Sequence, residues 1–257
     1  MESFRTPKFN SMLAFVLAGM LATTVHEISH SVASLLVGEK PTLFPGFTRL
    51  NDGVSSSHLI VIAGTGPLFS LTTGLLMILL FRNWGRGFVR LFWLWFAFLS
   101  AQIGFGYFFA AVISQTGDTG LVLSLLHAPW YVYAIVFGLG AAGSWLFLPR
   151  LWANRVSPLV ADKKQFNQVG MYPWLLGSGV LLVIYFIVGL LTSPGKPDLF
   201  GLFAIVTIGI FTPIANFASN APREPRTLVL TSPIMPAVLT VVVALGLIVG
   251  LTHGVGL

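Results

Sequence analysis

Hydrophobic residues occur along this chain in long blocks, and short polar or charged clusters separate the blocks. Several apolar runs reach the roughly 18 residues that a helix needs to cross a bilayer core of about 30 Å. Because lipid offers no hydrogen-bond partner to an exposed backbone, we expect these runs to be helical. The pattern predicts seven spans, which lie at 11–37, 58–81, 88–113, 130–148, 172–192, 199–218 and 234–251.

The clusters between the predicted spans are rich in glycine, proline and charge, as at 38–45, 82–90 and 222–226. The first span continues past its polar residues at 26–30 to Val37, and this length is too great for the apolar region of a signal peptide. The predicted fold class is therefore an all-α polytopic membrane protein with about seven transmembrane helices, forming a single membrane domain over 1–257.

The composition supports a multi-pass membrane location. Hydrophobic residues make up 55% of the 257 residues and charged residues only 9%, whereas soluble domains carry about 25% charged residues. We therefore expect the lipid bilayer as a partner, with a bacterial or archaeal cell membrane as the location. The net charge of +6 is not a nucleic-acid signal, because basic residues in membrane proteins sort by side of the bilayer. The absence of cysteine excludes disulfides, thiolate ligands and cysteine nucleophiles.

The basic residues predict an orientation for the seven spans. With the amino terminus in the cytoplasm, the inner side holds Arg5, Lys8, Arg82, Arg86, Arg90, Arg150, Arg155, Lys163, Lys164, Arg223 and Arg226. The outer side then holds Lys40, Arg49 and Lys196. This excess on the inner side is typical of a membrane protein whose amino terminus is cytoplasmic.

One strong chemical motif, His26-Glu27-Ile28-Ser29-His30, lies inside the first predicted span. Residues four apart share one face of a helix, so His26 and His30 can bind the same metal ion. Glu27 is offset by one position and can act as a general base on a water molecule activated by zinc. A charge at the centre of a bilayer costs at least about 2.5–3.5 kcal/mol on insertion scales, which favours a functional role for these residues. With five histidines in the chain, we expect a single metal ion.

A catalytic zinc ion usually has three protein ligands, so a third is needed. Asp118 lies in a polar, glycine-flanked break, Ser114 to Gly120, that follows the third predicted span. Glycine lets the backbone leave the helix, and irregular backbone at membrane depth is tolerated where it lines a cavity. Asp118 is therefore the favoured third ligand. His58 and His127 are the alternatives that the residues leave open.

These residues resemble the site-2 proteases, the M50 family of intramembrane zinc metalloproteases. The run from Met12 to Ala33 resembles the first core helix of that family, and Ala63-Gly64-Thr65-Gly66-Pro67 resembles the start of its next core helix. The segment from Gly38 to Thr48 resembles the short segment after the first helix of that family, so the resemblance implies a re-entrant or strand-like segment there. The resemblance covers about 10–125, with 130–257 as additional transmembrane helices. It implies that His26, His30 and Asp118 bind Zn²⁺ and that Glu27 is the catalytic base. Unlike the usual family pattern, neither Asn nor Pro precedes Asp118, and Thr119 separates it from Gly120.

The predicted function is that of an intramembrane zinc metalloprotease that cleaves a transmembrane protein substrate. The alternative is a non-proteolytic metal-binding membrane scaffold or transporter, which needs the histidines and Asp118 but no base at Glu27. A zinc hydrolase that acts on a lipid is a third interpretation, because a site within the bilayer meets lipids as well as peptides. The sequence predicts neither the oligomeric state nor the identity of the substrate.

Overall fold

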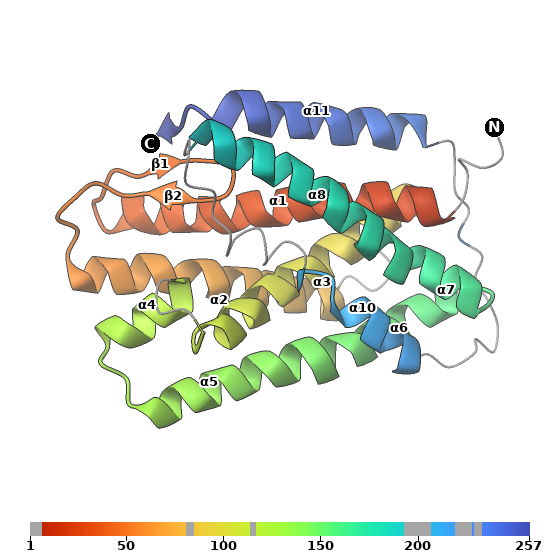
Figure 1. The fold of residues 1–257 in the computed structure, drawn as a ribbon, viewed down its shortest axis with the longest axis horizontal. Helices are drawn as coiled ribbons and strands as arrows, with labels where there is room; N and C mark the ends of the chain where they lie inside the picture. Colours follow the sequence, from red (N-terminus) through yellow and green to blue (C-terminus); the bar gives the residue numbers. More distant parts are fainter. Residues whose placement is uncertain (1–6, 81–84, 114–116, 193–206, 219–227, 229–232) are drawn as a thin grey trace.

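The structure is a computed structural model that describes the whole chain except residues 1–6, 81–84, 114–116, 193–206, 219–227 and 229–232 (Figure 1). Helices dominate the described part. Six helical stretches in it are long and apolar enough to cross a membrane: Pro7–Leu36, Ser56–Leu80, Gly87–Ala110, Trp130–Leu159, Lys163–Thr192 and Ile234–Leu251. The predicted class, a mostly helical protein with multiple membrane spans, is confirmed to this extent.

The first half of the chain supplies α1 (Pro7–Leu36), β1 (Thr42–Leu43), β2 (Thr48–Arg49), α2 (Ser56–Leu80), α3 (Gly87–Ala110) and α4 (Asp118–Leu125). The second half supplies α5 (Trp130–Ala142), α6 (Leu148–Val156), α7 (Lys163–Val169), α8 (Met171–Thr192), α10 (Phe211–Ala218), α11 (Ile234–Leu251) and β3 (Val255–Gly256). Of the predicted span at 199–218, residues 199–206 lie outside the described residues. The short helix α10 corresponds to the end of that predicted span.

The helices run roughly along the long axis of the molecule (Figure 1). α1, α3, α8 and α11 point one way, and α2 and α5 point the other way. α1 begins at one end of the molecule, and α11 ends at the other.

The predicted span at 130–148 ends too early. The helical chain continues through a π-helical turn, Gly143–Phe147, into α6 and then a 3₁₀ turn, Ser157–Leu159. The apolar run ends directly before Pro149 and Arg150, and proline lacks the N–H of the regular helical ladder. The π-helical turn changes the hydrogen-bond register directly before Pro149, so that proline stands in the first turn of α6, where its missing donor is tolerated.

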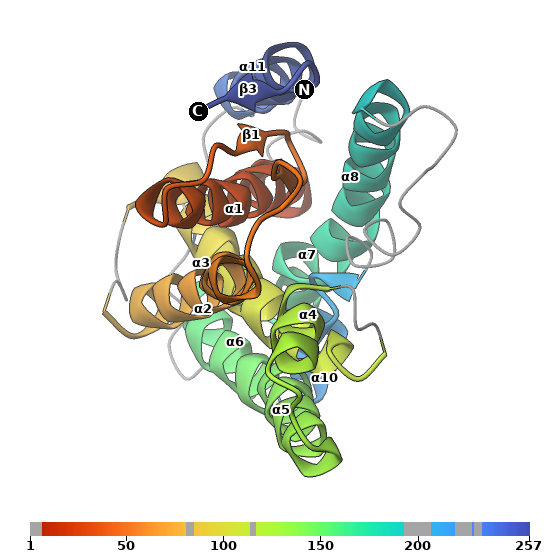
Figure 2. The same cartoon turned by 90° about the vertical axis from the view of Figure 1, so that its left-hand side faces the viewer.

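α1 is the central helix and is largely buried, because α2, α3, α8 and α11 surround it (Figure 2). Towards the amino-terminal end of α1, an aromatic cluster joins α3, α6 and α10. The Trp95 and Trp152 ring centroids lie 4.4 Å apart, and Phe98 meets Trp152 edge-on at 5.1 Å. Ser11 of α1 accepts a hydrogen bond from Trp95 Nε1 at 2.8 Å and donates one to the Val169 carbonyl at 2.6 Å. This packing holds the amino-terminal half of α1 against its neighbours. The motif at 26–30 lies in the carboxyl-terminal half of the same helix.

The segment after α1 forms a small sheet, which confirms the strand-like prediction. β1 pairs with β2 in an antiparallel hairpin, and β1 also pairs with β3 at the carboxyl end of the chain. The register places Leu43 opposite both Thr48 and Val255. Two-residue strands carry no readable periodicity, so the sequence did not indicate that β3 would join this sheet.

Candidate metal centre

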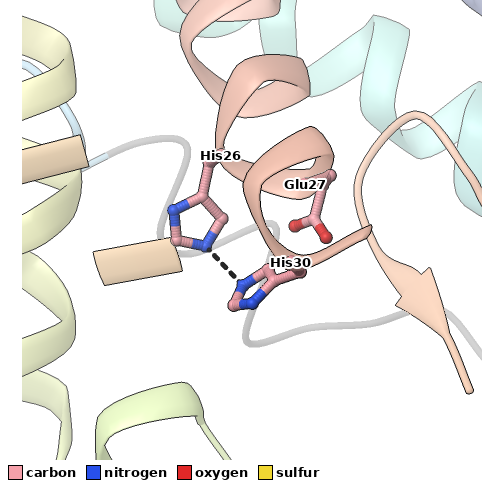
Figure 3. A group of neighbouring side chains, drawn as sticks. All are labelled: His26, Glu27 and His30. Carbon is pink, nitrogen blue, oxygen red and sulfur yellow. Dashed lines mark hydrogen bonds between the residues drawn. The ribbon is translucent and has the colours of Figure 1, made fainter. Parts of the chain in front are cut away.

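His26 and His30 bring two ring nitrogens to one point on the face of α1. Their Nε2 atoms lie 3.2 Å apart, and the two rings are nearly perpendicular, at 86° (Figure 3). At 1.5 Å per residue, His26 lies about 28 Å along a helix about 45 Å long. It therefore lies in the carboxyl-terminal half of α1, and both histidines are buried.

Asp118 completes this arrangement from a different part of the chain. It is the first residue of α4, and Gly117 precedes it in an extended conformation. Its Oδ2 atom lies 3.1 Å from the Nε2 of His26 and 3.1 Å from the Nε2 of His30. Residues 114–116 of the predicted break lie outside the described residues, and the described part, from Gly117 on, places the carboxylate beside both histidines.

The two alternative ligands lie elsewhere. The Nδ1 of His58 pairs with the Oε1 of Glu39 at 2.7 Å. His127 follows α4 at the end opposite Asp118, and nine residues of helix span roughly 13 Å. The structure therefore favours Asp118 over His58 and His127 as the third residue of this cluster.

The spacing of the three atoms fits a tetrahedral metal ion. Zinc bonds of about 2.0–2.2 Å with tetrahedral angles place neighbouring ligand atoms about 3.3 Å apart. The observed separations among His26 Nε2, His30 Nε2 and Asp118 Oδ2 are 3.1–3.2 Å. A wider grouping of His26, Glu27 and His30 has ligand atoms within 4.8 Å of one another. The Asp118 set matches the tetrahedral edge more closely than the set that contains Glu27.

The hydrogen bonds behind the rings strengthen this interpretation. The Nδ1 of His30 lies 2.7 Å from the Ile62 carbonyl oxygen, which can only accept, so this nitrogen carries a hydrogen. In neutral His30 the Nε2 atom then carries a lone pair and no hydrogen, and it faces a carboxylate oxygen at 3.1 Å. Two acceptors this close need a cation between them, either a proton or a metal ion.

His26 has a comparable partner on α2. Its Nδ1 lies 3.0 Å from the Oγ of Ser70, a buried residue. Metal-binding histidines almost always use their second nitrogen in a hydrogen bond of this kind. Sequence reasoning did not identify Ser70 or the Ile62 carbonyl. Ser70 follows Pro67 by three residues, which places it one helical turn further along α2.

The charge on Asp118 suits a cation site. Burial by itself would raise the pKa of the Asp118 carboxyl, but hydrogen bonds from His26 and His30, in the form in which their Nε2 atoms carry a proton, outweigh burial and hold that pKa below its ordinary value. The group is therefore an anionic carboxylate at neutral pH. Its side chain retains 25% exposure, so the cluster is not entirely closed.

Glu27 lies beside this cluster on α1 and is buried at 6% exposure. The hydroxyl of Thr48, on β2, lies 3.2 Å from the Oε2 of Glu27 and 3.0 Å from its backbone carbonyl oxygen. Ser31 also lies within hydrogen-bond distance of Thr48, at 3.2 Å. The hairpin after α1 thus covers Glu27 and provides a donor for its carboxylate. Thr48 is a further residue that the sequence did not single out.

Comparisons with protein-family models, with curated proteins and with solved structures find no match to this chain. The functional argument therefore depends on the geometry of the cluster and on the motif itself.

Proposed function

We propose that this protein is an intramembrane zinc metalloprotease, as its resemblance to the site-2 proteases implies. The observation that carries the proposal is the triangle of His26 Nε2, His30 Nε2 and Asp118 Oδ2, with edges of 3.1–3.2 Å. These three side chains would hold the zinc ion. When bound, zinc would supply Lewis acidity, which polarises a carbonyl group and makes a water molecule more acidic.

Glu27 would act as the proton carrier of the reaction. Its carboxylate takes a proton from the water molecule whose oxygen bonds to the carbonyl carbon of the substrate peptide. As the C–N bond breaks, Glu27 gives this proton to the departing amine nitrogen, so that the protein returns to its starting state. The hydrogen bond from Thr48 orients the carboxylate for both transfers.

The substrate class follows from the location of the site. α1 is long enough to cross a bilayer, and the cluster lies within it, in its carboxyl-terminal half. A peptide bond that reaches Glu27 would then belong to a membrane-embedded chain. A helical substrate would have to unwind locally, because its carbonyl groups are otherwise hydrogen-bonded within the helix. We therefore propose transmembrane proteins, most simply those with a single span, as substrates.

The direct test uses purified protein reconstituted in liposomes with a panel of single-span test proteins. We expect cleavage within a transmembrane segment of at least one of them. A chelator should abolish this cleavage, and added zinc should restore it. If the protein binds zinc but cleaves none of the panel, and cleaves a lipid substrate instead, the protease proposal is wrong.

A further inference from the structure

The two histidines of the candidate metal centre are held by groups of different character. The Nδ1 of His30 donates to the backbone carbonyl of Ile62, an acceptor with a fixed position in α2. The Nδ1 of His26 instead meets the hydroxyl of Ser70, which rotates and can either donate or accept. The hydroxyl alone therefore restrains the plane of the His26 ring only weakly.

A second restraint on His26 comes from α3. The ring of Tyr107 stacks on the His26 imidazole with centroids 4.9 Å apart and planes that differ by only 9° (Figure 2 shows α1 beside α3). His30 approaches the same imidazole edge-on, at 86°, so its contact does not cover the ring face in this way. Tyr107 is therefore the aromatic group that packs flat against His26.

We propose that Tyr107 is a positioning residue of the candidate metal centre, whose aromatic ring holds the plane of His26 so that Nε2 points to the position shared with His30 and Asp118. This inference rests on the metal-binding part of the proposed function and does not depend on peptide cleavage. Rotation of the imidazole about its Cβ–Cγ bond would move Nε2 away from the other two ligand atoms. Stacking opposes this rotation, because a turned ring would collide with the face of Tyr107.

The sequence could not indicate this role for Tyr107. The residue lies in an apolar, aromatic-rich stretch of α3, where tyrosine is an ordinary membrane residue, and it belongs to none of the motifs. Only the crossing of α3 with α1 brings it over a residue that is 81 positions earlier in the chain.

The test compares two substitutions at this one position. Tyr107→Phe keeps the ring and removes the hydroxyl, whereas Tyr107→Leu keeps an apolar side chain and removes the ring. Residues that support a metal ligand typically contribute about 10–100-fold to metal affinity. We therefore expect Tyr107→Leu to weaken zinc binding about 10-fold or more, and Tyr107→Phe to bind zinc like the wild type.

Zinc affinity would be measured in detergent by competition with a chromophoric chelator. The visible spectrum of the Co²⁺-substituted protein gives a second measurement, because its bands report the ligand geometry. Tyr131→Leu, an exposed position on α5, is the control for losing a tyrosine elsewhere. Tyr107→Met is a second non-aromatic variant in case the leucine variant does not fold.

Each result bears on the inference. Wild-type zinc affinity in Tyr107→Leu or Tyr107→Met would overturn it. Equal losses in the Phe and Leu variants would also overturn it, because the hydroxyl and not the stacked ring would then matter. Failure of the wild type to bind zinc would refute the metal centre and this inference together. Zinc binding without proteolysis would refute only the proposed protease activity.

Discussion

A side chain at Gly66 cannot coexist with the observed position of His30. A Cβ atom built on Gly66 would overlap the Nε2 and Cε1 atoms of His30 and would lie 2.8 Å from the Cε1 of His26. α2 thus passes directly over the two imidazoles, and glycine is the residue that permits this approach. The Ala63–Pro67 motif, noted in the sequence for its resemblance to a protease family, has a physical role in the candidate metal centre.

Gly66→Ala should therefore disrupt metal binding. The added methyl group must displace at least one imidazole, so we expect the purified variant to contain much less zinc than the wild type. Gly64→Ala is a matched control in the same motif, because its Cβ would meet only the Cγ2 of Val122, at 3.8 Å. Elemental analysis of both variants measures the effect. Equal zinc content in the two variants would show that the approach of α2 does not constrain the site.

Substitutions of Asp118 test the third ligand. Asp118→Ala removes the carboxylate that lies 3.1 Å from both Nε2 atoms, so we expect most of the zinc to be lost. Asp118→Asn replaces an anionic ligand with a neutral amide, and added zinc should partly restore binding. Asp52→Asn, an exposed position after β2, is the control for removing a charge. Full zinc retention in Asp118→Ala would assign the third ligand to another residue.

Thr48 is expected to affect catalysis and not metal binding. Thr48→Val keeps the shape and the strand preference but removes the donor to Glu27. Hydrogen bonds to charged groups contribute about 1.5–3 kcal/mol, so we expect cleavage to slow by about 10-fold or more. Zinc content should not change. Thr42→Val on the neighbouring strand β1 is the matched control, and equal rates in the two variants would show that Thr48 does not support Glu27.

The spans and the histidine pair could be predicted from the sequence because both depend on local patterns. Apolar length indicates a membrane helix, and a spacing of four residues places His26 and His30 on one face regardless of their surroundings. The glycine-flanked break also pointed to Asp118, although its approach to the histidines depends on how α4 packs beside α2. The predicted spans at 58–81, 88–113, 172–192 and 234–251 agree with the helices to within a few residues.

The supporting groups could not be predicted, because they come from crossings between distant segments. Ser70, Thr48 and Tyr107 are ordinary residues in their own stretches of sequence, and only the packing of α2, β2 and α3 on α1 brings them to the motif at 26–30. The pairing of β3 with β1 is of the same kind. The extension of the 130–148 span beyond Pro149 was missed because a π-helical turn has no signature in the hydrophobic pattern.

The central claim is that Glu27 is the base of a zinc-dependent peptide cleavage, and Glu27→Gln tests it most directly. The substitution nearly preserves the shape of the side chain and leaves His26, His30 and Asp118 in place. The measurement is the cleavage rate of a reconstituted single-span test protein, together with zinc content, in the wild type, Glu27→Gln and His26→Ala. Removal of a general base typically costs about 10²–10⁴-fold in rate, so Glu27→Gln should keep its zinc and lose cleavage by that factor. Wild-type cleavage by Glu27→Gln, with His26→Ala inactive, would contradict the account and leave the metal with a role that needs no base.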